Sequence, residues 1–189
     1  MNIFILDKNA TVAASYLCTI HINKMLLESA QLLSTCCNRL FNESKQIEGL
    51  YQSTHLNRPN EVWLRESQAN FKWLLDHGAI IGSIYQQNKC KIHQSSKVIV
   101  RAAKYFDGNY YKLPDEYKLE DCTLPYLVMT TEFNHLQKKY GQPIVRGKNT
   151  HYRANSWEDA VIAYREYYKA KQFKRGQMTW YGNNKPEWY

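Results

Sequence analysis

The chain has 189 residues, of which 44% are hydrophobic, and it contains five tryptophans. This composition excludes wholesale disorder, and the length suits a single domain with a sizeable core. No stretch approaches the roughly 20 consecutive apolar residues that a membrane span needs, so we expect no membrane partner. The formal net charge of +8 favours a polyanionic partner, most often nucleic acid, and a protein that is merely basic is the alternative.

The first residues and the cysteines indicate the cellular setting. Residues 1–7 hold a short apolar run with no basic region before it, which predicts a short buried strand or extended segment rather than a signal peptide. The five cysteines are odd in number and form no CxxC motif, so we interpret them as reduced, small apolar residues of a cytoplasmic protein. Neither they nor the six histidines show a metal-binding spacing, and we expect no metal and no cofactor.

Hydrophobic spacing predicts three helices in the first part of the chain. The first covers about residues 10–41, with Asn9 as its N-cap, and a polar loop follows it. The second begins directly after Pro59, which is well placed to end that loop. Gly78 is a candidate point of division in this second helix, because glycine weakens a helix interior. A third, short helix is predicted over residues 96–106.

The remainder of the chain is less regular. Residues 107–155 contain three prolines and several Gly and Asn, so we expect at most one or two short helices there. A fourth clear helix begins at Ser156, where the sequence resembles a capping box. A basic, aromatic tail over 179–189 ends the chain. The prediction is therefore an all-α fold, a single domain over residues 1–189 with an irregular insertion at about 107–155.

A polar stripe on the first predicted helix is the strongest candidate site. With 3.6 residues per turn, His21, Lys24, Glu28 and Gln31 fall on one narrow line of that helix. Both flanks of the line are apolar, which indicates that the stripe is partly buried. Proton donors, acceptors and a cation that are half withdrawn from water are typical of an active site.

Within this stripe Glu28 is the best candidate for a general base or a charge-stabilising group. The alternative is an ordinary surface ion pair between Lys24 and Glu28, one helical turn apart. Lys24 itself could bind a phosphate or, if desolvated, act as an amine nucleophile that forms a Schiff base. The spacing alone leaves these interpretations open.

The last quarter of the chain combines positive charge with aromatic rings. From residue 141 onward there are nine Lys or Arg against four acids. Basic side chains neutralise phosphates, and aromatic faces stack on unpaired bases, each stack contributing roughly 1–3 kcal/mol. Trp180 and Tyr181 in the tail could stack in this way or could belong to the core. We interpret three aromatic residues at helical spacing as core: Trp157, Tyr164 and Tyr168.

Other chemistry has little support in the sequence. Arg65 and Glu66, beside Trp63, form a second polar patch that could contact a ligand, although a solvated helix face is the favoured interpretation. The chain contains no G-x-S-x-G, P-loop, G-x-G-x-x-G or H-E-x-x-H motif. The common hydrolase, NTPase and dinucleotide mechanisms are therefore not predicted.

Two features together resemble the phage pyrimidine-dimer DNA glycosylases of the endonuclease V type. The first is His21 followed seven residues later by Glu28 on the first long helix of a small basic protein. The second is the Thr-Trp-Tyr sequence at 179–181, which is similar to the aromatic tail of that family. The opening residues and the stripe look closest to uncharacterised phage and large-virus members of the group.

The resemblance implies a mechanism, and this sequence differs from the family at several positions that the mechanism uses. In the family a free N-terminal amine attacks the deoxyribose C1′, a glutamate assists, and β-elimination cuts the strand. Carried over, Glu28 is that glutamate and His21 is a backbone or sugar contact. Asn2 is too large to favour removal of the initiator methionine, so the amine is expected on Met1. Ile3 and Gln31 stand where the family has arginines.

The sequence thus favours a DNA glycosylase or AP-lyase-like enzyme of viral origin that recognises a damaged or modified base. The predicted catalytic residues are Glu28, His21, Met1 and Lys24. The predicted nucleic-acid contacts are Gln31, Arg65, Arg153, Lys174, Arg175, Trp180 and Tyr181. The partner is DNA, as a duplex with a flipped base or as a single strand, or a nucleotide. The alternatives are a non-cleaving virus-encoded nucleotide- or nucleic-acid-binding protein that counters host defence, and a base- or nucleotide-modifying transferase.

Overall fold

The computed structural model describes the chain except for residues 1, 43–44, 118–119, 176–177 and 184, with the backbone alone at 172–175 and 183. The described residues form one mainly helical domain with seven α-helices and a two-stranded sheet. The helices are α1 (Ala10–Ser15), α2 (Thr19–Phe41), α3 (Pro59–Leu64), α4 (Gln68–Lys89), α5 (Gln94–Asn109), α6 (Asn134–Tyr140) and α7 (Trp157–Arg175). The strands are β1 (Gly141–Arg146) and β2 (Asn149–Ala154). Among the described helices, none combines the length and apolar character that crossing a membrane requires.

The first predicted helix is in fact two, α1 and α2. Asn9 caps α1 as expected, since its side-chain oxygen accepts the N–H groups of Thr11 and Val12. The chain then breaks before α2, and other groups hold the backbone there. The Cys18 N–H donates to the Tyr168 hydroxyl (2.8 Å), and the Thr19 N–H donates to the carbonyl of Thr179 (2.8 Å). A tertiary interaction therefore overrides the continuous helical pattern.

The second predicted helix is also divided, but not at glycine. The break lies between α3 and α4, where the Ser67 hydroxyl caps α4 by accepting the Asn70 N–H. Helix α4 passes through Gly78 without interruption. A Cβ atom at that position would lie 2.9 Å from Cδ1 of Ile99, so glycine allows α5 to approach closely. The third predicted helix is α5, which is longer than expected at both ends.

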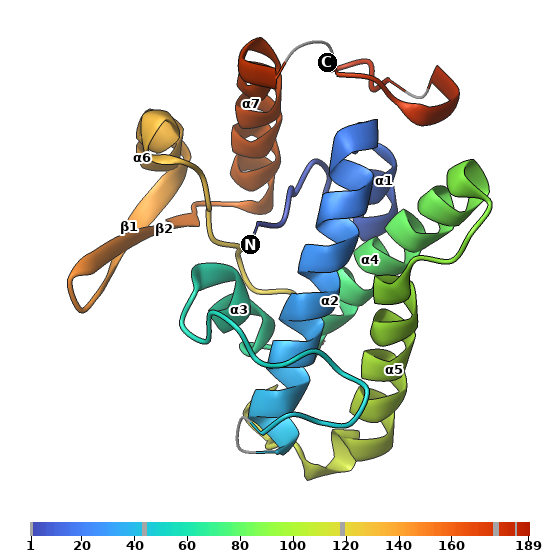
Figure 1. Cartoon of the computed structure of the whole chain (residues 1–189). Helices are drawn as coiled ribbons and strands as arrows, with labels where there is room; N and C mark the ends of the chain where they lie inside the picture. Colours follow the sequence, from blue (N-terminus) through green and yellow to red (C-terminus); the bar gives the residue numbers. More distant parts are fainter. Residues whose placement is uncertain (1, 43–44, 118–119, 176–177, 184) are drawn as a thin grey trace.

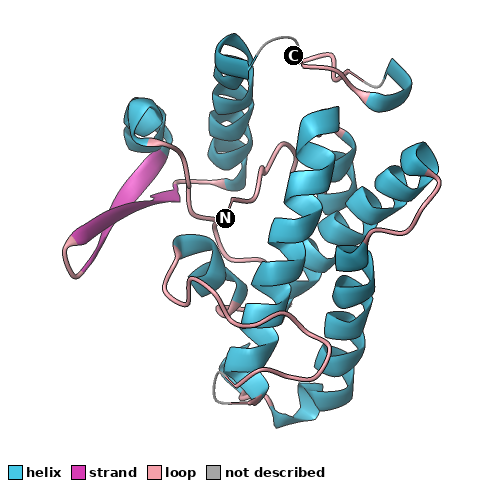
Figure 2. Ribbon diagram, in the orientation of Figure 1, coloured by secondary structure: helices cyan, strands magenta, loops and turns pink. Residues whose placement is uncertain are grey.

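The prediction of an all-α fold is wrong in the segment that it left irregular. Residues 107–155 contain α6 and several 3-10 turns, but also the antiparallel hairpin of β1 and β2 (Figure 2). The hairpin is mostly exposed and lacks the alternation of apolar and polar residues that marks a half-buried strand. Neighbouring backbone fixes it instead, since Leu127 donates to Tyr152 and Ala154 donates to Pro125.

Figure 1 shows α2 in the centre of the molecule, with α4 and α5 on one side and α7, α6 and the hairpin on the other. Helices α4 and α5 both contact α2, whereas α7 contacts α6 and β2. The predicted buried segment at the start of the chain joins these two groups. Ile3, Phe4, Ile5 and Leu6 are each at most 2% exposed. The Phe4 ring packs against His21 of α2 and against three tyrosines of α7.

Helix α4 buries a histidine without a hydrogen-bond partner among the described residues. The His77 side chain is 1% exposed, and both ring nitrogens are unpaired. Its ring stacks on Trp73, with 5.2 Å between the centroids. Burial lowers the pKa of His77 to about 3, so the imidazole is neutral in the folded protein at pH 7.

This histidine predicts a loss of stability in acid. Between pH 6.5 and 3 the unfolded chain binds one more proton at His77 than the folded chain does. The free energy of unfolding should therefore fall with decreasing pH in that window, by up to about 1.4 kcal/mol per pH unit from this group. Urea denaturation at several pH values gives the slope of the free energy of unfolding against pH. In His77→Phe, which keeps a ring against Trp73, this slope should correspond to about one bound proton fewer than in the wild type. The exposed control His135→Phe should retain the wild-type slope, and an unchanged slope in His77→Phe would contradict the assignment.

Candidate functional site

The start of the chain lies directly on Glu28. The backbone N–H of Asn2 donates a hydrogen bond to Oε2 of Glu28 (2.5 Å). Nζ of Lys24, one helical turn earlier on α2, lies 3.7 Å from Oε1 of the same carboxylate. The Glu28 side chain is 14% exposed and the Lys24 side chain is 51% exposed. A largely buried carboxylate thus holds the first described backbone nitrogen on one oxygen and faces an accessible cation with the other.

The rest of the polar stripe varies in burial along α2. His21 is 1% exposed, and its Nδ1 lies 2.8 Å from the Tyr168 hydroxyl. Its ring stacks on Phe4, with 4.9 Å between centroids. Gln31, at the other end of the stripe, is partly exposed. His21 therefore supports the N-terminal segment from inside the core, whereas Lys24, Glu28 and Gln31 reach the surface.

Contacts from Asn2 lead to a second cluster that includes Arg153. The Tyr164 hydroxyl lies 3.4 Å from Oδ1 of Asn2 and 3.1 Å from the carbonyl oxygen of Tyr126. The guanidinium of Arg153 stands 4.5 Å from the centre of the Tyr126 ring, and Nη2 of Arg146 donates to the Tyr126 hydroxyl (2.7 Å). Two cations from β1 and β2 are therefore linked to Asn2 indirectly, through Tyr126 and Tyr164.

Arg153 also forms an ion pair with Glu66, whose other oxygen accepts the Thr123 hydroxyl. Burial opposes the positive charge of Arg153, but Glu66 and Tyr126 raise its pKa above the ordinary value. The guanidinium is thus permanently charged and rigidly placed. Part of its charge is already neutralised by Glu66, so its capacity for a phosphate is reduced.

The structure assigns Arg65 a structural role. Its Nε and Nη2 donate to the two oxygens of Glu61 (2.7 and 2.8 Å), and Nη2 also reaches the carbonyl of Leu56 (3.2 Å). The Glu61 side chain is fully buried. Burial raises the pKa of Glu61 even though Arg65 acts in the opposite direction. Of the two residues predicted to form a patch, Arg65 thus pairs with Glu61 and Glu66 pairs with Arg153, so the favoured interpretation of a solvated helix face is wrong.

The aromatic tail packs on the protein itself, away from Glu28. The indole Nε1 of Trp180 donates to the carbonyl of Tyr16 (2.9 Å), and its ring contacts Tyr189. Nζ of Lys89 lies over the Tyr181 ring at 5.8 Å. The tail meets the first residue of α2, and Glu28 lies nine positions further on, which is roughly 13 Å along the helix. Trp180 and Tyr181 are thus not brought to Glu28.

Three of the predicted site residues fall wholly or partly outside the described part of the chain. Met1 lies outside the described residues. Lys174 and Arg175 end α7, and their side chains lie outside the described part as well. The three aromatic residues interpreted as core do pack internally: Tyr164 and Tyr168 are fully buried, and Trp157 contacts Trp63 and Trp73.

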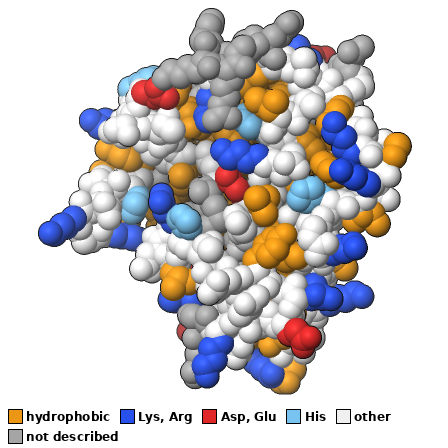
Figure 3. Space-filling view, in the orientation of Figure 1, with side chains coloured by type: hydrophobic (Ala, Val, Ile, Leu, Met, Phe, Trp, Pro, Cys, Tyr) orange, Lys and Arg blue, Asp and Glu red, His pale blue; other side chains and the backbone are white. Residues whose placement is uncertain are grey.

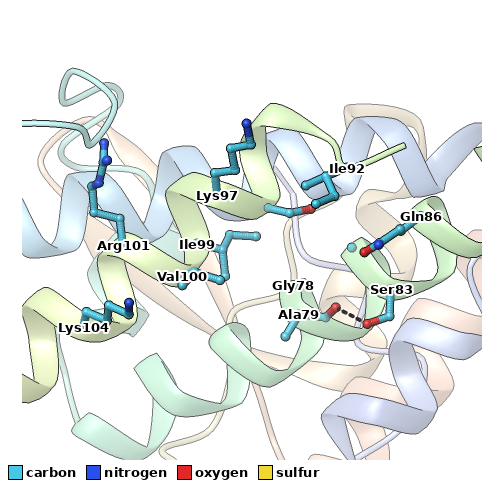
Figure 4. A pocket seen from close by; sticks show the side chains of 12 residues that line it. Gly78, Ala79, Ser83, Gln86, Ile92, Lys97, Ile99, Val100, Arg101 and Lys104 are labelled. Atoms are coloured by element: carbon cyan, nitrogen blue, oxygen red, sulfur yellow. Dashed lines mark hydrogen bonds between the residues drawn. The ribbon is translucent and has the colours of Figure 1, made fainter. Parts of the chain in front are cut away.

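A separate cavity of about 560 Å³ lies between α4 and α5 (Figure 4). Gly78 and Ala79 of α4 line one side, and Lys97, Arg101 and Lys104 of α5 line the other. None of the residues predicted to form a site lines this cavity. Its described lining contains cations but no carboxylate and no histidine.

Positive charge is widely distributed around the candidate site. Figure 3 shows Lys and Arg side chains spread over the face that carries the start of the chain, whereas carboxylates appear at few places on it. This distribution agrees with the formal net charge of +8. Such a face attracts polyanions over distances of about a Debye length, roughly 8–10 Å in ordinary salt.

The sequence pattern did not single out Asn2, Tyr126 or Arg146 as site residues. The contact between Asn2 and Glu28 joins residues 26 positions apart, and no local spacing encodes it. One signal was available, because a buried apolar segment at residues 3–6 must place its flanking polar atoms beside a partner. Tyr126 follows Pro125 in the segment taken as irregular, where no pattern distinguishes it.

Comparisons with protein-family models, with curated proteins and with solved structures find no match to this chain. Function is accordingly inferred from the chemistry of the site.

The ion pair of Arg65 and Glu61 yields a stability test that separates a structural from a ligand-binding role. Arg65→Met leaves the Glu61 carboxyl buried without its partner, so urea denaturation should show a loss of about 3 kcal/mol. The double variant Glu61→Gln with Arg65→Met should recover part of that loss, because no charge stays buried. Arg101→Met, at an exposed arginine, is the control and should cost less than about 1 kcal/mol. A loss for Arg65→Met no larger than for the control would overturn the structural role.

Proposed function

We propose that this protein acts on DNA as a glycosylase or AP-lyase-like enzyme with its reaction centre at Glu28. The observation that carries the proposal is the hydrogen bond from the Asn2 N–H to Oε2 of Glu28. Consecutive backbone nitrogens are at most about 4 Å apart, so an amine on either Met1 or Asn2 has this carboxylate within reach. A primary amine can form a Schiff base with an aldehydic sugar carbon, and a largely buried carboxylate beside it can accept the proton that the amine loses.

The proposed reaction begins when the neutral amine forms a bond to C1′ of the deoxyribose and the bond from C1′ to the base breaks. The Glu28 carboxylate accepts the proton lost by the amine and returns it to the departing base. A proton passes from water to O4′ as the sugar ring opens, which leaves a protonated Schiff base. The Glu28 carboxylate then accepts the C2′ proton, the electron pair of that C–H bond forms a new double bond, and the bond from C3′ to its phosphate oxygen breaks so that the phosphate leaves and the strand is cut.

Lys24 and His21 have different proposed roles in this scheme. Lys24 is accessible and adjacent to Glu28, so its ammonium can contact a phosphate of the bound strand. His21 is too deeply buried to touch DNA, and we assign it as a positioning residue that holds Phe4 and thereby Asn2. Arg146 and Arg153 lie on the hairpin beside Tyr126, whose carbonyl lies near the same Tyr164 hydroxyl as the Asn2 side chain.

Reduction with borohydride tests the proposal. Incubation with duplex DNA that carries an abasic site or a pyrimidine dimer should give a covalent protein–DNA adduct when borohydride is present. Glu28→Gln should slow adduct formation by about a hundredfold or more, because general acid–base groups contribute 10²–10⁴-fold. Its free energy of unfolding should change by less than about 1 kcal/mol, since the amide oxygen can still accept the Asn2 N–H.

Glu116→Gln is the matched control, because Glu116 is exposed and the charge change is identical. This variant should form the adduct at the wild-type rate. The absence of an adduct from both DNA substrates would overturn the proposal. Tight, salt-dependent binding in that case would support the non-cleaving nucleic-acid-binding protein instead.

A further inference from the structure

A polar pocket of about 470 Å³ lies between the loop before α3 and strand β2. His55, Asn57 and Arg58 line it from the loop, and Asn149 and His151 line it from the hairpin. The described residues that line it include no Asp or Glu. Every polar side chain in that set can donate a hydrogen bond, and one is a guanidinium. The chemistry of the pocket thus favours an anion.

The loop side of this pocket is fixed in place before any ligand arrives. The Thr54 N–H donates to Oγ1 of Thr35 on α2 (3.1 Å), and Nη2 of Arg65 donates to the carbonyl of Leu56 (3.2 Å). His55 has a left-handed backbone with φ of 58°, and its carbonyl accepts the Arg58 N–H (2.9 Å). The resulting turn brings the side chains of His55 and Arg58 to one cavity.

The hairpin side is fixed as well. Strand β2 is held by the ion pair of Arg153 with Glu66, which lies between α3 and α4, and the Tyr152 carbonyl accepts the N–H of Leu127 (2.8 Å). His151 directly precedes Tyr152 on β2 and pairs with Ile144 of β1. Since both walls are held by contacts outside the pocket, ligand binding would require little reorganisation.

Two arginine charges act on the hairpin side of the pocket. Burial and the nearby charges of Arg146 and Arg58 lower the pKa of His151 below its ordinary value. Burial is the largest of these causes and disfavours any charge, whereas the charges of Arg146 and Arg58 favour a negative ligand beside His151. Figure 3 shows histidine side chains together with Lys or Arg side chains on the face in front of the hairpin.

We propose that this pocket binds a phosphate group, with Arg58 as the principal charged contact and His55, His151 and the two asparagines as neutral donors. A guanidinium presents paired N–H groups that match two phosphate oxygens, and imidazole and amide N–H groups can take the others. The phosphate can belong to a nucleic-acid strand or to a small phosphate compound, since the chemistry of both is the same. This assignment does not depend on the reaction proposed at Glu28.

Titration with inorganic phosphate, followed by the imidazole proton resonances of His55 and His151, tests the site. The resonances should shift saturably, and Arg58→Gln should weaken binding by about tenfold. Arg58→Lys, which keeps the charge but not the paired N–H groups, should weaken it less. Arg101→Gln is the matched control, because Arg101 is also exposed and lies on α5, away from this pocket; it should bind as the wild type does.

A second arm distinguishes the source of the phosphate. If the pocket holds a strand, Arg58→Gln should weaken binding of a labelled abasic duplex severalfold more than Arg101→Gln does. If the pocket serves a small compound, duplex binding should be equal in the two variants while phosphate binding is lost only in Arg58→Gln. Shifts that never saturate, or equal phosphate affinity in Arg58→Gln and the wild type, would overturn the phosphate site. Thermal unfolding of each variant verifies that it is folded.

Discussion

Burial of residues 3–6 between α2 and α7 is the constraint on which the candidate site depends. Phe4 is 2% exposed and packs on His21 of α2 and on Tyr168 of α7. Full burial of one such side chain contributes roughly 1.5–3 kcal/mol, and four consecutive residues are buried here. Burial of these residues fixes the position of the neighbouring Asn2, whose N–H donates to Glu28. The geometry of the polar site is therefore set by apolar packing.

The same packing explains other irregularities in the fold. The Tyr168 hydroxyl meets both His21 and the N–H of Cys18, and this contact accompanies the break between α1 and α2. The chain returns to this place at its other end, since Thr179 accepts the N–H of Thr19. Phe4 and the C-terminal tail thus both lie against the beginning of α2. The rings of the aromatic tail cover this region, since Trp180 donates to the carbonyl of Tyr16 and Trp188 packs on Tyr168. These rings therefore make contacts within the protein itself.

Local signals in the sequence predicted local structure well. Asn9 and Ser156 marked helix starts correctly, because a cap is encoded within three residues. The stripe on α2 identified Glu28 and Lys24, which share one helix face. Contacts between distant segments had no such signal, and so the hairpin and the partner of Arg65 were not predicted. Gly78 is the clearest example, because the close neighbour that requires glycine at this position is Ile99, which lies on another helix.

We propose that an amine at the start of the chain, held beside Glu28, is the group that reacts with the sugar. Mass spectrometry of the proteolysed, borohydride-trapped adduct identifies that group, because the reduced sugar stays on the nitrogen that attacked. We expect the added mass on the α-nitrogen of the N-terminal peptide, whether that peptide begins with Met1 or Asn2. Recovery of the added mass on the side chain of Lys24, or on any other lysine, would contradict it.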